Sequence, residues 1–288
     1  MISVLFSKGK SDENDSDNED KHFEHLPSIE PSYEHSLPSM GPSYEPSLLP
    51  SSLPSLKMSD STYPSSEPSI IPSFTQNPSS GPTSSISLSL KEFFNATNGD
   101  SWENNLNWNS PIVSECEWYG IDCLADSEEI YKLQLNSNSL NGSIPSVISD
   151  LTTLQTLYLE SNTLTGFIPS EIGLLSSLEH LLLQSNSFIG MIPNEVRSLL
   201  NLRILSLEYN ALTGQIPSEI GLLSNLTILT LYSNSLTGKI PSELGLLSGL
   251  EYLYLHDNNL TGEVPSEVCE LSNGNTLLSV DDDINNCS

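Results

Sequence analysis

The sequence predicts an α/β solenoid, in which short strands stack into a parallel sheet and short return segments cover its back. The first of three observations is a period, because the apolar residue that opens each unit recurs every 24 positions, at Ile130, Leu154, Leu178, Leu202, Leu226 and Leu250. The others are an alternation of leucines with polar residues and the recurrence of Asn, Gly and Ile-Pro at fixed places in each unit. A constant period of this length outweighs local secondary-structure preferences.

Each unit begins with a short strand. The alternation Leu157-Tyr158-Leu159-Glu160 puts the two leucines on one face, toward the core, and Tyr158 and Glu160 on the other. An asparagine follows, where its amide can bond backbone groups that a tight turn leaves unpaired. We therefore predict an internal asparagine ladder made of Asn138, Asn162, Asn186, Asn210, Asn234 and Asn258.

The rest of each unit returns the chain to the next strand. Gly166 and its equivalents allow the chain to turn back, and Ile168-Pro169 favours a short extended or 3₁₀ segment over a long helix. Ile172 and Leu175 would close the core from the far side. Six such units are predicted over residues 130–273.

The pattern N-x-L-x-G-x-I-P-x-x-I/L-G-x-L resembles the plant-type leucine-rich repeat, as in receptor-kinase ectodomains and polygalacturonase-inhibiting proteins. The resemblance covers roughly residues 88–288. It implies a right-handed horseshoe with a concave parallel β-sheet and a short 3₁₀ or extended convex side. It also implies a protein that recognises ligands rather than transforming them.

An N-terminal cap is predicted over residues 86–129, because the first repeat would otherwise expose its leucines to water. It should begin with a helix that ends before Asn98-Gly99 and buries an apolar face made of Leu88, Leu90, Phe93 and Phe94. The cap of plant-type repeats is matched by Trp102, Trp108 and the stretch from Cys116 to Cys123. A C-terminal cap is predicted over residues 274–288.

The four cysteines lie at the two ends of the repeats. Six strands at about 4.8 Å would separate the ends by roughly 29 Å, whereas a disulfide needs Cα atoms within about 7 Å. Cys116 can therefore pair only with Cys123, and Cys269 only with Cys287. A zinc site is rejected because neither end holds more than two sulfurs. Disulfides imply an oxidising compartment.

Residues 1–85 are predicted to be a disordered, acidic tail. Residues 1–87 hold 12 of the 19 prolines, and their apolar residues follow no sustained period. Repeated Pro-Ser steps favour polyproline-like extension. Two roles stay open: a stalk carrying O-linked sugars and an unmodified linker.

We expect an extracellular or cell-surface location, with a cytoplasmic one as the alternative. The apolar start, residues 1–6, is too short for a signal peptide, and no run of 18 apolar residues could span a membrane. The cap, the tail and four glycosylation sequons nevertheless favour secretion and hence a truncated start. The sequon asparagines are Asn95, Asn141, Asn225 and Asn259.

The net charge of −28 limits the partners. With 9 basic residues against 37 acidic ones, binding to nucleic acid or to an anionic membrane surface is disfavoured, and a basic partner is favoured. The alternative is that the acidity only keeps the solenoid soluble.

No catalytic motif is visible, so we expect no enzyme, no cofactor and no metal site. Five glutamates recur on the return side and could bind calcium loosely. We interpret them as surface residues instead, because one row of monodentate carboxylates lacks the six to eight converging oxygens that calcium takes. They are Glu171, Glu195, Glu219, Glu243 and Glu267.

The concave face remains as the candidate binding surface. Its outward positions vary while the frame is constant, and tyrosines and carboxylates, which suit a binding face and a basic ligand, concentrate there. The candidates are Tyr158, Glu160, His180, Gln184, Glu208, Tyr209, Tyr232, Tyr252, Tyr254, His256 and Asp257.

The predicted function is receptor-like or co-receptor-like recognition of a peptide or protein. The alternatives are a secreted inhibitor of a cell-wall-degrading enzyme, a structural or adhesive surface protein, and an ordinary solvated sheet with no ligand.

Overall fold

The computed structural model describes residues 85–272, 276–281, 284 and 287, and the structural statements below concern these residues. The prediction of a disordered tail falls outside them, apart from Ser85, which begins a helix.

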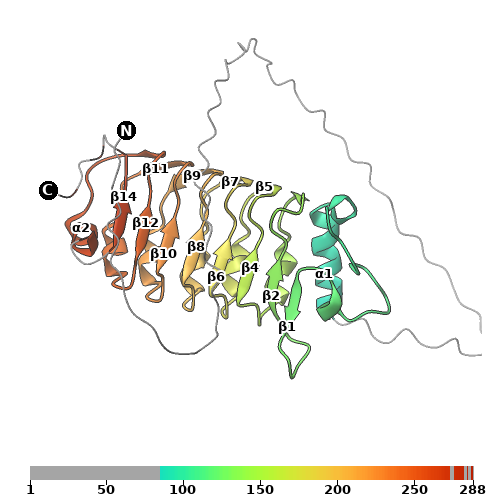
Figure 1. Cartoon of the computed structure of the whole chain (residues 1–288). Helices are drawn as coiled ribbons and strands as arrows, with labels where there is room; N and C mark the ends of the chain where they lie inside the picture. Colours follow the sequence, from blue (N-terminus) through green and yellow to red (C-terminus); the bar gives the residue numbers. More distant parts are fainter. Residues whose placement is uncertain (1–84, 273–275, 282–283, 285–286, 288) are drawn as a thin grey trace, which may run out of the picture. The chain divides into compact units, whose positions relative to one another are not determined.

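An eight-stranded sheet runs the length of the repeats (Figure 1). Its strands follow chain order, and each parallel strand pairs with its equivalent one period away, as Leu157 with Leu181. Only β1 is antiparallel to its neighbour. The strands are β1 (Ile121–Cys123), β2 (Ile130–Gln134), β4 (Thr156–Tyr158), β6 (His180–Leu182), β8 (Ile204–Ser206), β10 (Ile228–Thr230), β12 (Tyr252–Tyr254) and β14 (Leu277–Ser279).

A second, six-stranded sheet lies after the asparagine turns, where the sequence predicted no strands. Its parallel strands carry Thr-Leu-Thr-Gly or a similar stretch, in which the central apolar residue is buried. We call it the lateral sheet. Its strands are β3 (Asn141–Gly142), β5 (Thr163–Gly166), β7 (Ser187–Gly190), β9 (Ala211–Gln215), β11 (Ser235–Gly238) and β13 (Asn259–Leu260).

The return segments are short 3₁₀ helices, as Ile-Pro predicts, and a proline directly precedes each one. They are η3 (Ser146–Asp150), η4 (Ser170–Leu174), η5 (Asn194–Ser198), η6 (Ser218–Leu222) and η7 (Ser242–Leu246). In the sixth unit the return segment is an α-helix, α2 (Ser266–Ser272). The predicted fold, a leucine-lined parallel solenoid with 3₁₀ returns, is confirmed.

The apolar residues of successive units form one continuous core. Leu157, Leu205 and Leu229, from three different strands, are each fully buried, and Phe188 takes the place of a leucine without leaving the core. Each unit alone could not bury this surface, so its stability depends on its neighbours.

The predicted asparagine ladder is present and links each repeat to the one before it. Asn210 Nδ2 donates to the carbonyl oxygens of Leu183, Leu207 and Glu208 at 3.1, 3.0 and 3.3 Å. Its Oδ1 accepts from the backbone N–H of Phe188 at 3.0 Å. One amide thus satisfies backbone groups of two repeats that water does not reach.

The N-terminal cap covers the first repeat with helix α1 (Ser85–Ala96) and the 3₁₀ segments η1 (Gly99–Ser101) and η2 (Glu115–Glu117). Leu90, Phe93 and Phe94 are buried as predicted, but Leu88 is 59% exposed. The prediction for Leu88 is wrong. An α-helix turns by about 100° per residue, so Leu88, two residues before the buried Leu90, lies on nearly the opposite face of the helix.

Three tryptophans complete this cap. Trp102 and Trp108 lie edge to face at 4.8 Å, and Trp118 lies 5.1 Å from Trp108. The disulfide between Cys116 and Cys123, with Cα atoms 5.5 Å apart, joins η2 to β1, as predicted.

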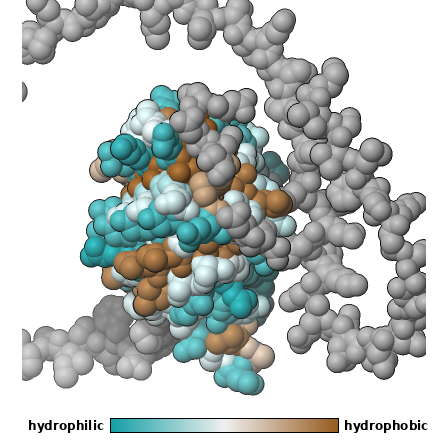
Figure 2. Space-filling model, turned by 90° about the vertical axis from the view of Figure 1, so that its left-hand side faces the viewer, coloured by the Kyte–Doolittle hydropathy of each residue, from teal (hydrophilic) through white to brown (hydrophobic). Residues whose placement is uncertain are grey.

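At the C-terminal end β14 extends the main sheet by one more parallel strand, in register with β12. Asp281 accepts from the backbone N–H groups of Asp257 and Asn258 at 2.6 and 3.3 Å, which in earlier repeats bond to backbone carbonyls of the following repeat. The predicted disulfide between Cys269 and Cys287 closes this end. Figure 2 shows the surface of this end, where hydrophobic residues lie between hydrophilic ones.

We predict that Asn210→Ala lowers the free energy of unfolding by about 2 to 4 kcal/mol, because it leaves several buried backbone groups without a partner. Asn201→Ala is the matched control, since Asn201 is exposed and makes one bond, to the carbonyl of Ser176. Urea denaturation measures both. Equal losses for the two variants would contradict a special role for the ladder.

Candidate functional site

The concave face is the surface of the eight-stranded sheet that points away from the core. Because strand side chains alternate, the residues between and after the core leucines form columns across it. The column after the second leucine runs Asn136, Glu160, Gln184, Glu208, Tyr232 and His256, and the parallel register stacks these residues at successive strands.

Glu208 is the most buried charged residue of this face, at 9% exposure. It accepts a hydrogen bond from the Thr230 hydroxyl on the next strand, at 2.5 Å. Burial raises the pKa of its carboxyl, and the bond from Thr230 partly offsets that rise. Glu208 therefore does not fit the alternative of an ordinary solvated sheet, because its side chain is buried and bonded to Thr230.

Glu160 and Gln184 continue this row and have unsatisfied acceptors. Burial raises the pKa of Glu160, and the negative charge of Glu208 adds to the rise. Glu160 Oε2 and Gln184 Oε1 are inaccessible to water and have no hydrogen-bond partner among the described residues. We call Glu160, Gln184 and Glu208 the acceptor row.

The described part of the chain offers no cation to this row. Its two ion pairs lie elsewhere: Lys132 with Asp122 at 3.5 Å, and Arg203 with Glu179 at 3.9 Å. The acceptor row is thus an excess of buried acceptors that the protein's own basic side chains leave uncompensated.

An aromatic cluster lies next to the acceptor row, formed by Tyr209, Tyr232, Tyr252, Tyr254 and His256. The Tyr232 ring stacks on His256 at 4.6 Å and meets the edge of Tyr209 at 5.1 Å. Tyr252 and Tyr254 pack edge to face at 6.0 Å. Burial, with the charge of Glu208 as a further cause, raises the pKa of Tyr232, so its hydroxyl keeps its proton.

Tyr209 has an unusual backbone. The residue before each ladder asparagine is in the left-handed region, and this place is held by serine at Ser161, Ser185 and Ser233. Tyr209 occupies it with φ 53° and a side chain 52% exposed. A bulky residue in this region is strained, and strain of this kind clusters at functional sites. The sequence pattern alone did not reveal it.

Tyr158 and His180 form a separate pair at the other end of the face. The Tyr158 hydroxyl lies 3.3 Å from His180 Nδ1, and burial lowers the pKa of His180. Asp257, at the last left-handed position, accepts from the Ser233 hydroxyl at 3.3 Å. The structure therefore brings all the candidate residues to one face, but divides them into this pair, the acceptor row, the aromatic cluster and Asp257.

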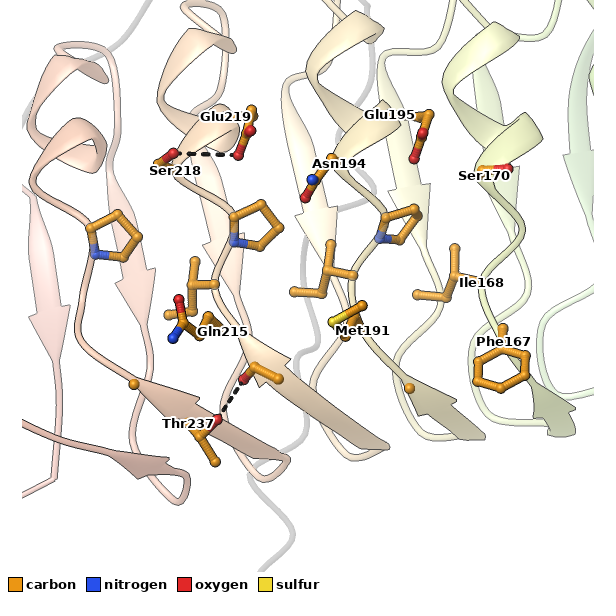
Figure 3. A pocket seen from close by; sticks show the side chains of 18 of the residues that line it. Phe167, Ile168, Ser170, Met191, Asn194, Glu195, Gln215, Ser218, Glu219 and Thr237 are labelled. Atoms are coloured by element: carbon orange, nitrogen blue, oxygen red, sulfur yellow. Dashed lines mark hydrogen bonds between the residues drawn. The ribbon is translucent and has the colours of Figure 1, made fainter.

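A hollow of the described residues lies elsewhere, between the lateral sheet and the 3₁₀ helices (Figure 3). It has a volume of about 1310 Å³. Two exposed residues line it, Phe167 and Met191, whose exposed fractions are 65% and 68%. None of the candidate residues lines it. Glu195 and Glu219 do, but the described residues contain no group of three or more His, Cys, Asp or Glu that could hold a metal ion.

Two further features concern the location of the protein. The four sequon asparagines are all exposed, and their glycosylation stays a prediction. Among the helices that the structure describes, none is both long and apolar enough to cross a membrane.

Comparison with known proteins identifies the family. Family models described as leucine-rich repeats match residues 128–188, 201–223, 225–247 and 249–271. A chain of the BIR3–SERK2 complex from Arabidopsis thaliana is 36% identical with a TM-score of 0.51, and the alignment covers 61% of this chain and 93% of that one. The chain belongs to the leucine-rich repeat family.

Two further leucine-rich repeat structures have a TM-score of 0.60. A plant ice-binding protein is 34% identical over 64% of this chain and 59% of its own, so the present chain spans about three fifths of that protein. Pollen receptor kinase 3 is 27% identical over 69% of this chain and 96% of its own. No curated protein sequence matches this leucine-rich repeat chain significantly.

We predict that Tyr209→Ser stabilises the repeats by roughly 1 kcal/mol, because serine fits the left-handed position with less strain. Ser185→Tyr, the reciprocal change at the equivalent position one repeat earlier, should destabilise by a similar amount. Urea denaturation of the two variants measures both effects. A loss of stability in Tyr209→Ser would show that the aromatic contacts of Tyr209 outweigh its backbone strain.

Proposed function

We propose that the chain is a non-catalytic recognition module, receptor-like or co-receptor-like, that binds a peptide or protein of basic character through the concave face. The observation that carries this proposal is the acceptor row, whose buried oxygens have too few donors, beside an aromatic cluster in which Tyr209 is exposed and the other rings are half-buried. Tyrosines supply rigid contact area, and uncompensated carboxylates select for a cationic partner.

The dimensions of the face fit a short segment. The six strands of the repeats, β2 to β12, span roughly 24 Å at about 4.8 Å per strand, and an extended peptide at about 3.4 Å per residue covers this with about seven residues. Such a segment could be a free peptide or the exposed loop of a folded partner. An inhibitor of a secreted enzyme would use the same face to bind an exposed loop of that folded enzyme.

Similar proteins support this proposal in general terms. One similar chain forms the BIR3–SERK2 complex, and another is a receptor kinase. Disulfides at both ends and exposed sequons are consistent with an extracellular place of action.

A library of random heptapeptides tests the proposal. We expect it to enrich sequences with Lys or Arg near the middle and an aromatic or aliphatic residue nearby. Glu208→Ala should weaken their binding by about 1 to 3 kcal/mol, because the ligand's charge would lose a desolvated partner. Isothermal titration calorimetry with the full chain measures this.

The control for the whole face is a pair of triple variants. Glu160→Ala, Glu208→Ala and Tyr232→Ala together should abolish binding. Glu171→Ala, Glu195→Ala and Phe167→Ala together remove two glutamates and one aromatic ring from the return side of the repeats and should leave binding unchanged. Enrichment of acidic peptides, or binding that survives the first triple variant, would reject this face.

A second candidate function, ice binding, is favoured by the lateral sheet. Its outward positions carry exposed threonines in line, and three of their hydroxyls donate to glycine carbonyls of the preceding repeat: Thr165 to Gly142, Thr237 to Gly214 and Thr261 to Gly238, at 3.0 to 3.2 Å. These bonds fix the rotamers of the three threonines, which lie with Thr213 in one column of the lateral sheet. Ile189 interrupts this column between Thr165 and Thr213. One similar structure is a plant ice-binding protein.

If this second function holds, Thr213→Lys with Thr237→Lys should abolish thermal hysteresis, because two long charged side chains would interrupt the array. Thr156→Lys, on the concave face, is the matched control and should leave thermal hysteresis unchanged. A full chain without any effect on ice growth would reject this candidate and leave the first untouched.

A further inference from the structure

Three outward residues at the lateral sheet depart from the pattern of their repeats, and they do so at one place. Phe167 and Met191 stand in a column that holds Ser143 and Gln215 in other repeats. Ile189, two residues before Met191, stands in the threonine column. All three are exposed. Because polar residues occupy these positions elsewhere, the repeat does not need apolar ones here, and an exposed apolar group of this kind marks an interaction site.

These residues border the hollow of Figure 3, which we call the lateral hollow. Phe167 and Met191 lie along its lateral-sheet side, and Glu195 and Glu219 lie along the side of the 3₁₀ helices. Between the two sides lies Ile168, which is almost fully buried. The lateral hollow is therefore apolar along one wall and acidic along the other.

We propose that the lateral hollow docks an amphipathic helix of a partner protein. The apolar side of this helix packs on Phe167 and Met191, and its Lys or Arg residues face Glu195 and Glu219. None of these residues belongs to the concave face, so the inference does not depend on the function proposed for that face.

The backbone around the lateral hollow favours a helix over an extended segment. The strands that border it, β5, β7, β9 and β11, are all paired on both sides, because β3 and β13 form the edges of the lateral sheet. Pro193 and Pro217, which also line it, have no N–H to donate. A segment bound there must satisfy its own backbone groups, and an α-helix does so.

The spacing of the repeats also suits a helix. The lateral hollow crosses the repeats, whose strands are about 4.8 Å apart, and one helical turn rises by about 5.4 Å. Residues three or four apart on the helix would therefore meet equivalent positions of successive repeats. Two apolar residues at this spacing would contact Phe167 and Met191, and two basic residues beside them would meet Glu195 and Glu219.

The charges select this occupant over two others. Glu195 and Glu219 take part in no ion pair in the part of the chain that the structure describes, and Lys239 is the one basic residue among the described residues that line the lateral hollow. A second copy would bring an equal acidic wall and a net charge of −28, so the two copies would repel each other. An anionic membrane surface would be repelled as well.

The experiment selects ligands for the full chain from a displayed library of alanine-rich helical peptides of about four turns. We expect the enriched sequences to carry apolar residues three or four positions apart, with Lys or Arg along one flank. Enrichment of acidic sequences, or of sequences without a helical period, would overturn the proposal.

Two pairs of substitutions locate the binding site. Phe167→Ser with Met191→Gln should weaken the enriched peptides at least about 10-fold, because their apolar side loses its contacts. This variant should fold, since Ser143 and Gln215 hold the same column in other repeats. Leu174→Ser with Leu222→Ser, the control, removes two exposed leucines that do not line the lateral hollow and should leave affinity unchanged. Equal effects of the two pairs would overturn the proposal.

A charge reversal tests the acidic wall. Glu195→Lys with Glu219→Lys should weaken an enriched basic peptide about 10-fold, and replacing the Lys and Arg residues of that peptide with Glu should restore its binding to this variant. Because the rescue is a gain of binding, poor folding of the variant cannot imitate it. A peptide that binds the wild type and this variant equally would contradict the charge pairing and thus the proposal.

Other occupants of the lateral hollow would also give definite results. Sedimentation should show a monomer, and flotation with phosphatidylcholine vesicles should show no binding. A dimer, or vesicle binding, that Phe167→Ser with Met191→Gln abolishes would assign the lateral hollow to a second copy or to a lipid surface. A photoreactive residue in place of Gln215 that cross-links within its own chain would assign it to the protein itself. Each of these results would overturn the proposal.

Discussion

The structure depends on the hydrogen bonds of the ladder asparagines. A solenoid core contains turns at every repeat, and their backbone groups would be left unpaired in an apolar interior. Asn162 donates to carbonyls of its own repeat and of the preceding one, and its Oδ1 accepts from the N–H groups of Asn138 and Leu140. Where the ladder ends, Asn104 and Asp281 supply partners from the two caps.

This constraint fixes the register and thereby the concave face. If every ladder asparagine must reach the same carbonyls, each strand must stack on the last without a shift, and its outward residues must form straight columns. The residue before the asparagine must then adopt a left-handed backbone, which explains why small or polar residues occupy most of these places. Tyr209 departs from that rule beside the acceptor row.

The repeated features could be predicted from the sequence because a period averages out local ambiguity: the core leucines, the ladder and the strand columns all follow from it. Features that occur only once in the chain could not be predicted in this way. Strand β14 has no repeat motif, the burial of Glu208 depends on Thr230 and the tyrosines of later repeats, and the exposure of Leu88 depends on the phase of a single helix. The lateral sheet was missed because its strands are short and follow a turn signal.

The same stacking that stabilises the solenoid brings the carboxylates of Glu160 and Glu208 into one column, with the neutral amide of Gln184 between them. At an effective dielectric constant of about 20, two charges on strands about 9.6 Å apart repel by about 1.7 kcal/mol, against about 3.5 kcal/mol on adjacent strands. The neutral amide of Gln184 thus halves the repulsion that two carboxylates on adjacent strands would have. Because the strict register forces outward side chains into straight columns, a neutral residue between two acids limits the electrostatic cost of the stacking.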